Sequence, residues 1–135
     1  MTARDFRDDA ITGATIEALE AFESALALFQ SWRAGMSEPI ERALLLAPEF
    51  TMAHVLAAYR HLTSRDLARV RKAVGPYKRL LKLPANRREQ LHIAAIGATL
   101  ADDYRGAKAV FGKLLAEFPH DVLALQIAHS FDYVK

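Results

Sequence analysis

The chain contains no cysteine, which excludes disulfide bridges, thiolate metal sites and thiol catalysis. It also lacks any apolar run that approaches the roughly 18 residues of a membrane span. The first residues, MTARDFRDDAITG, are charged and lack the apolar core of a signal peptide. Sustained period-two alternation and Asn-Gly or Asp-Gly turns are missing too. These absences predict an all-α, cytoplasmic protein that does not associate with membranes.

Catalytic and phosphate-binding motifs are absent as well. Gly106 and Gly112 are separated by five residues, where a phosphate loop requires four, and they lie in a predicted helix. Neither G-x-G-x-x-G nor G-x-S-x-G occurs. We therefore predict no catalytic residue, no cofactor and no metal, and we interpret Asp102 and Asp103 as acids that favour a helix N-terminus.

What the sequence does contain is a repeat marked by Pro48, Pro84 and Pro119, at intervals of 36 and 35 residues. Each proline follows an apolar helical run, and proline ends a helix because it lacks an amide hydrogen. A period near 34 residues is typical of stacked helical hairpins such as tetratricopeptide repeats. Ala107 and Phe111 occupy the small and aromatic positions of that repeat. We predict a tetratricopeptide-like α-solenoid of stacked antiparallel hairpins with about seven helices.

The chain divides into an irregular lead-in at 1–14 and a helical-repeat domain at 15–135. The domain should contain hairpins at about 15–47, 50–83 and 86–118, followed by a final helix at 121–135. The individual helices are expected near 15–34, 37–47, 50–63, 65–82, 87–101, 104–117 and from 121 onward. The Gly75-Pro76 pair interrupts the fourth helix, which should kink or divide into two.

Several residues have the chemistry of helix caps. Ser37 and Ser64 are predicted N-caps, and Gly35 is predicted to end the first helix. Asn86 with Glu89 three residues later forms a capping-box pattern.

Three stretches are more specific than a generic repeat: LLLAPEFTMAH at 44–54, RREQLHIAAIG at 87–97 and LLAEFPHDVLALQIAH at 114–129. In residue identity and order, they resemble three segments of the tetratricopeptide repeat protein 38 family: (A/D)P-x-F-x-x-(A/G)H, RRE-x-x-H and P-x-D-x-L-A-L-x-x-x-H. The matching residues are Pro48, Phe50, His54, Arg87, Arg88, Glu89, His92, Pro119, Asp121, Leu123, Ala124, Leu125 and His129. The resemblance implies an α-solenoid and brings no agreed activity. Family members are typically much longer, and the Gly75-Pro76 break is atypical of them.

Three histidines form the first candidate binding group. His54, His92 and His129 lie on the first helices of successive hairpins, and first helices line the concave surface of a solenoid. Zinc would need three or four converging ligands, and no H-x3-H pair is present. We expect each histidine to pack between helices and donate to a carbonyl or carboxylate, with a metal or catalytic cluster as the alternative.

A basic segment forms the second candidate group. Residues 60–88 carry ten Lys or Arg and one acid, whereas both flanking segments are acidic. The candidate binding residues in it are Arg65, Arg69, Lys72 and Lys78. The segment is either a helix face neutralised by the acidic first repeat or a surface for an anionic partner. Nucleic acid is the less favoured partner, because Tyr77 is the only aromatic in that helix and no duplex-docking motif occurs.

The leading hypothesis is a non-enzymatic helical-repeat module that binds a protein or peptide partner in its groove. One alternative is an enzyme or metal-dependent component built on the first-helix histidines. Another is an electrostatic binder of nucleic acid or acidic surfaces through 60–88.

The last helix has an apolar stripe of Leu123, Ile127, Phe131 and Val134, and repeat arrays need a polar cap. Leu125 and Phe131 should be left to meet another surface. We therefore expect either a homodimer through the C-terminal helix or a fragment of a longer solenoid.

Overall fold

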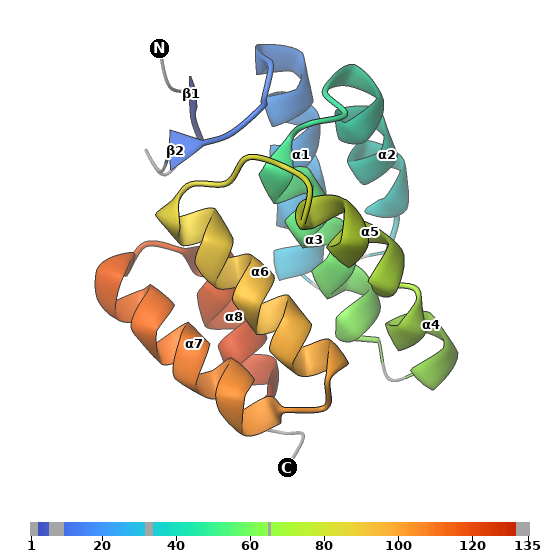
Figure 1. Cartoon of the computed structure of the whole chain (residues 1–135). Coiled ribbons are helices and arrows are strands. Elements are labelled where there is room, and N and C mark those ends of the chain that lie inside the picture. Colours follow the sequence, from blue (N-terminus) through green and yellow to red (C-terminus); the bar gives the residue numbers. More distant parts are fainter. Residues whose placement is uncertain (1–2, 6–9, 32–33, 65, 132–135) are drawn as a thin grey trace.

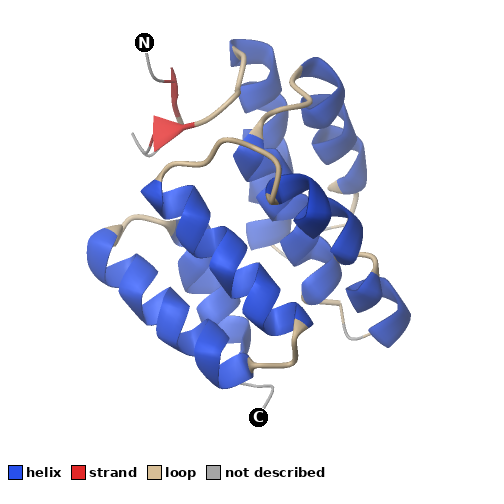
Figure 2. Ribbon diagram, viewed as in Figure 1, coloured by secondary structure: helices blue, strands red, loops and turns tan. Residues whose placement is uncertain are grey.

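The computed structural model describes residues 3–5, 10–31, 34–64 and 66–131, and its regular structure is almost entirely helical (Figure 2). The helices are α1 (Ile16–Gln30), α2 (Ser37–Leu46), α3 (Thr51–Leu62), α4 (Leu67–Arg71), α5 (Val74–Leu80), α6 (Arg87–Leu100), α7 (Tyr104–Glu117) and α8 (Val122–Phe131). These helices become seven if α4 and α5 are counted as the one interrupted helix that the sequence predicts. The all-α prediction is confirmed.

A short β-ribbon precedes the helices, within the segment for which the sequence predicts no regular structure. Strand β1 (Ala3–Arg4) pairs antiparallel with β2 (Ala10–Ile11). Two residues per strand are too few to produce a visible alternation of apolar and polar side chains. The ribbon is held instead by contacts with the helical domain, because Ile11 belongs to the core and is buried.

The predicted break in the fourth helix is present, but it precedes the Gly75-Pro76 pair. Helix α4 ends at Arg71, and α5 begins at Val74, which makes Pro76 the third residue of the new helix. Proline is tolerated there because the amide hydrogens of a first helical turn have no partner within the helix. A continuous helix would have required an amide hydrogen on residue 76 to bond the Lys72 carbonyl, and proline has none. A new helix therefore begins at Val74, two residues before Pro76.

Two of the predicted N-caps are confirmed. Asn86 and Glu89 form a complete capping box, with each side chain accepting from the other's backbone amide at 2.9 Å. Asp103 caps α7 by accepting from the Gly106 amide at 2.9 Å. A Cβ at position 106 would lie 2.2 Å from the Asp103 carboxylate, so a larger residue there would displace this cap.

The caps predicted at residues 37 and 64 are wrong. Ser37 is the first residue of α2, and the cap position is held by Met36. Asp66 caps α4 by accepting from the Ala68 amide, because the chain uses Ser64 in the turn that follows α3. Gly35 does not end the first helix either, since α1 stops at Gln30 and Gly35 lies in the following connection with φ 96°.

The helices pack as neighbouring pairs along the chain (Figure 1). Helix α1 packs on α2, α3 on α4 and α5, and α6 on α7, while α8 packs on α7. Helix α3 is central, because it also contacts α1, α2 and α6. Helices α1 and α8 touch as well, and the Gln126 amide donates to the Phe29 carbonyl at 2.9 Å. The first and last helices therefore approach each other on one side of the array.

The core is continuous through these pairs. Ala107 and Phe111, predicted to be buried where two helices cross, are 0% and 1% exposed. Phe111 packs 6.2 Å from Tyr59, centroid to centroid, and Phe22 packs 5.1 Å from Phe50. Among the described residues, every helix falls short of the length and apolarity that a membrane crossing requires.

Candidate functional site

The RRE-x-x-H segment begins helix α6, and each of its side chains contacts a different part of the chain. Arg87 is exposed and forms a bidentate pair with Glu117, at 3.0 and 3.1 Å, which joins the start of α6 to the end of α7. The other three side chains point into the protein, since Arg88, Glu89 and His92 are all buried. Of the four residues that define the motif, only Arg87 is therefore exposed to solvent.

Glu89 fastens the N-terminal segment to α6. Its carboxylate accepts from the Thr12 hydroxyl at 2.6 Å and from the Thr12 amide at 2.9 Å. The same carboxylate accepts the amide of Asn86, whose side chain donates to the Ala10 carbonyl at 2.9 Å. Several hydrogen-bond donors offset the cost of burying this carboxylate, and one side chain combines helix capping with a tertiary contact.

Arg88 and Asp121 form a buried ion pair at the centre of the same region. The Arg88 guanidinium lies 2.9 Å from the Asp121 carboxylate and 3.6 Å from that of Asp5. Asp121 also accepts the Ala124 amide at 2.9 Å in the first turn of α8. The pair thus ties α6 to α8 and to the N-terminal segment.

His92 extends this pair into a chain of hydrogen bonds that ends at Tyr59. The imidazole Nε2 lies 2.7 Å from Asp121, and Nδ1 lies 2.7 Å from the Tyr59 hydroxyl. The Asp121 carboxylate accepts from the Nε2–H group, and the Tyr59 hydroxyl donates to Nδ1 or accepts from it, according to whether Nδ1 carries a proton. We name the connected side chains of Tyr59, Arg88, His92 and Asp121 the polar clamp.

The charges in the polar clamp alter the acidity of its members. Burial favours a raised pKa for Asp121, but the nearby His92 and Arg88 outweigh it and hold that pKa well below its usual range. Burial, together with the Asp121 charge, raises the pKa of Tyr59 well above its ordinary value. At neutral pH, Asp121 is therefore an anion and the Tyr59 hydroxyl keeps its proton.

The structure does not bring the three candidate histidines together. His92 is in the polar clamp, and His129 is exposed on α8. His54 is half-buried on α3 and donates from Nε2 to the Pro48 carbonyl at 2.8 Å. Burial is the main cause that lowers the pKa of His54. Within the described ranges, no three His, Asp or Glu side chains are arranged to hold a metal ion.

The basic segment forms an exposed surface over α4, α5 and their connections. We call its cationic side chains the basic face: Arg69, Arg71, Lys72, Lys78, Arg79 and Lys82. Five of the six are exposed, and Arg69 is half-buried. Throughout the described part of the chain, none of the six forms an ion pair with another residue. Arg65, the remaining predicted member, lies outside the described residues.

The acids near the basic face do not neutralise it. Asp66 is the only acid between residues 60 and 88, and its carboxylate is occupied as the cap of α4. His61, next to these cations on α3, has its pKa lowered by burial and by the positive charges of Arg60, Arg69 and Lys72. The local potential is therefore positive, as an anion-binding surface requires.

Comparison of the chain with protein-family models, curated proteins and solved structures gave no match. The assignment of a site therefore depends on the geometry above. Sequence reasoning missed Tyr59 and Thr12, which lie 33 and 77 residues from their hydrogen-bond partners His92 and Glu89. It also missed Arg60, which belongs to the basic segment but was not singled out as a binding residue. No spacing rule links Tyr59 or Thr12 to its partner, although Tyr59 continues the apolar stripe of Met52 and Val55 on α3, which was a signal of its burial.

Proposed function

We propose that this chain is a non-enzymatic helical-repeat module, with a tetratricopeptide-like solenoid arrangement, that binds an acidic protein or peptide through the basic face. The observation that supports it most directly is the set of six cations on α4, α5 and their connections, none of which forms an ion pair with a described residue. Exposed cations that form no internal pairs remain available to a partner, and complementary charge raises the rate and specificity of association.

We place the partner on the basic face, and not in a groove lined by the first helices, because α1 is already in contact with α8. The first helices of a solenoid line its groove, yet α1 and α8 contact each other here through Gln126 and Phe29. The basic face has no comparable cover among the described residues, and it borders the half-buried Arg60 at the end of α3.

The histidine-based enzyme is the less favoured hypothesis. In the described conformation, the His92 imidazole and the Asp121 carboxylate are buried and bonded to each other. A catalytic base needs to reach its substrate within hydrogen-bonding distance. Nucleic acid is also less favoured, because Tyr77 is half-buried and its hydroxyl occupies the space beside Gly97 of α6.

A charge-reversal experiment tests the proposal with a labelled oligo-glutamate peptide as the probe. Reversal of Arg69, Lys72 and Lys78 to Glu should abolish binding in fluorescence anisotropy at physiological salt. The matched control reverses Arg42, Arg105 and Lys113, which are exposed cations outside the basic face. Equal losses in both variants would indicate attraction to net charge alone and would refute the proposal. A DNA oligonucleotide that binds more tightly than the peptide would favour the nucleic-acid alternative.

We also propose that α8 forms a homodimer contact. Leu125 on α8 is 57% exposed, while Leu123 and Ile127 are buried in the domain itself. The side chain of Phe131 and the whole of Val134 lie outside the described residues. Light scattering at micromolar concentration should give about twice the chain mass of 15.0 kDa, and Leu125→Glu should return the protein to a monomer. A wild-type chain that remains monomeric at high concentration would refute this contact.

A further inference from the structure

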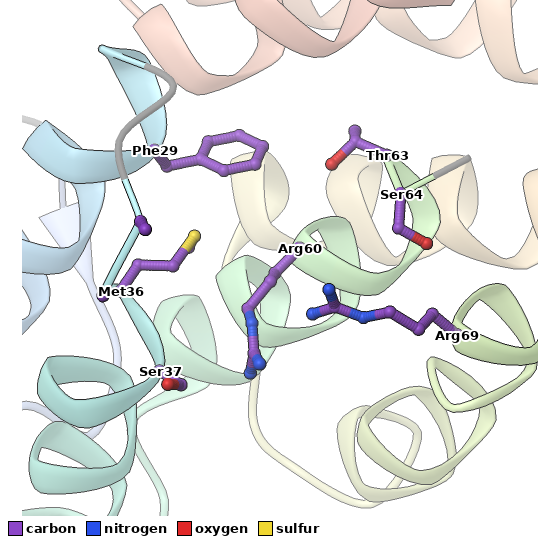
Figure 3. Close-up of a pocket in the computed structure, with 9 residues that line it drawn as sticks. Phe29, Met36, Ser37, Arg60, Thr63, Ser64 and Arg69 are labelled. Carbon is purple, nitrogen blue, oxygen red and sulfur yellow. The ribbon is translucent and has the colours of Figure 1, made fainter. Parts of the chain in front are cut away.

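An open pocket lies beside the basic face, between the α1–α2 connection, the end of α3 and α4 (Figure 3). Its volume is about 350 Å³, within the range of sites that hold small ligands. Phe29 and Met36 form one wall, and Arg60 and Arg69 extend into the space from α3 and α4. The pocket therefore combines an apolar wall with two cations.

The described residues around the pocket do not neutralise the positive charges of its two arginines. Among the residues that the structure describes, neither Arg60 nor Arg69 forms an ion pair. Burial and the charge of Arg69 lower the pKa of Arg60, and Glu41 on α2 opposes this without contacting the guanidinium. Two like charges that face one shared space repel each other, and an anion placed between them would relieve that repulsion.

The beginning of α2 supplies further donors at the same place. Ser37 lines the pocket, and its hydroxyl makes no hydrogen bond to any described residue. The cap position of α2 is held by Met36, and among the described residues no side chain caps the Ser37 and Glu38 amide hydrogens of that first turn, in which Pro39 has no amide hydrogen. Uncapped amides at a helix N-terminus favour a negative charge.

We propose that this pocket binds a phosphate monoester carried on a side chain of the acidic peptide partner. The proposal rests on the proposed function, because the basic face supplies the surface for the rest of that peptide. A phosphate monoester carries a charge of about −1.5 to −2 on three terminal oxygens and can face both guanidinium forks at once, whereas a carboxylate carries one negative charge on two oxygens. Clusters of arginine are a recurring means of recognising phosphorylated segments. The remaining pocket volume accommodates the side chain that carries the phosphate.

The test compares three synthetic acidic peptides that differ only at one central position, which is phosphoserine, glutamate or serine. The wild-type chain should bind the phosphoserine peptide at least about tenfold more tightly than the glutamate peptide, because charge-assisted bonds to a second guanidinium are gained. Arg60→Gln and Arg69→Gln should each remove that preference. Lys82→Gln is the matched control, since Lys82 is exposed on the basic face outside the pocket.

A second variant separates recognition from folding. Arg60→Lys keeps the charge in the last turn of α3 but loses the planar fork, so it should fold normally and lower the preference for phosphoserine. Equal binding of the phosphoserine and glutamate peptides by the wild-type chain would overturn the pocket assignment and leave the proposed function intact. Failure of all three peptides to bind would refute both proposals. Saturable binding of inorganic phosphate alone, lost in Arg69→Gln, would assign the pocket to a free anion and overturn the peptide-borne source.

Discussion

Charged side chains are used in opposite ways in two regions of this molecule. Around the start of α6, Arg88, Glu89 and Asp121 are buried, and each has several bonded partners from distant segments. Over α4 and α5, the cations of the basic face are mostly exposed and form no ion pair with a described residue. Charge in the first region therefore determines how segments assemble, whereas charge in the second remains available for a partner.

The largest difference between the two regions should appear in unfolding free energy. Asp121→Ala should cost about 3–5 kcal/mol, because it leaves Arg88 and His92 buried without their shared partner. Urea denaturation followed by circular dichroism measures this cost. The triple reversal of Arg69, Lys72 and Lys78 should leave the urea midpoint almost unchanged, since exposed charges contribute little to stability. The comparison fails if the triple reversal unfolds the chain or if Asp121→Ala is tolerated.

Glu117→Ala provides a matched control for the polar clamp. It removes an ion pair only four residues before Asp121, but that pair is exposed. Its loss should hardly alter the urea midpoint. A cost comparable to that of Asp121→Ala would show that burial is not what distinguishes the two ion pairs.

The apolar packing next to the polar clamp should be comparably sensitive. Phe111→Ala should cost about 3–5 kcal/mol, the usual range for a buried phenylalanine, and should disturb Tyr59, on which the ring packs. Leu45→Ala is the control, because Leu45 on α2 is 83% exposed and lies outside the proposed dimer contact. A cost below about 1 kcal/mol for Phe111→Ala would argue against a tight crossing of α6 and α7.

The smallest effect is expected from acidification near neutral pH. Burial lowers the pKa of His54 in the folded chain, so its contribution to stability is present above the unfolded value of about 6.5 and falls as the pH drops below it. His54→Gln should therefore lose less stability than the wild type between pH 7.5 and pH 5.5. Thermal melts across this interval measure the difference. A wild type whose loss equals that of His54→Gln would place the pH sensitivity elsewhere.

Much of the helical architecture could be read from local sequence. The prolines and the threefold and fourfold spacing of apolar residues placed α6 and α7 within a residue or two of their observed limits. The capping box at Asn86 and Glu89 was also predictable, because both partners lie within one turn. Caps at the start of α2 and α4 were predicted incorrectly, since the choice among neighbouring polar residues depends on where the preceding helix stops.

The candidate sites were predictable only in part. The charge of the 60–88 segment is a property of composition, and the sequence indicated it directly. The RRE-x-x-H segment was noticed through a resemblance, but its partners Thr12, Tyr59 and Asp121 lie 29 to 77 residues away. The pocket lined by Arg60 and Arg69 depends in the same way on the approach of the α1–α2 connection to α3 and α4.

The sequence by itself determined that this chain is helical, where most of its helices begin and end, and which segment is basic. These properties follow from periodicity, proline and local hydrogen bonds, all of which act within a few residues. Only the tertiary structure decided that His92 is buried against Asp121 and that His54 and His129 lie apart from it. It also decided that the basic face has no ion-pair partner among the residues that the structure describes. Those outcomes depend on which distant segments pack together, because a buried charge is stable only where the fold supplies its partner.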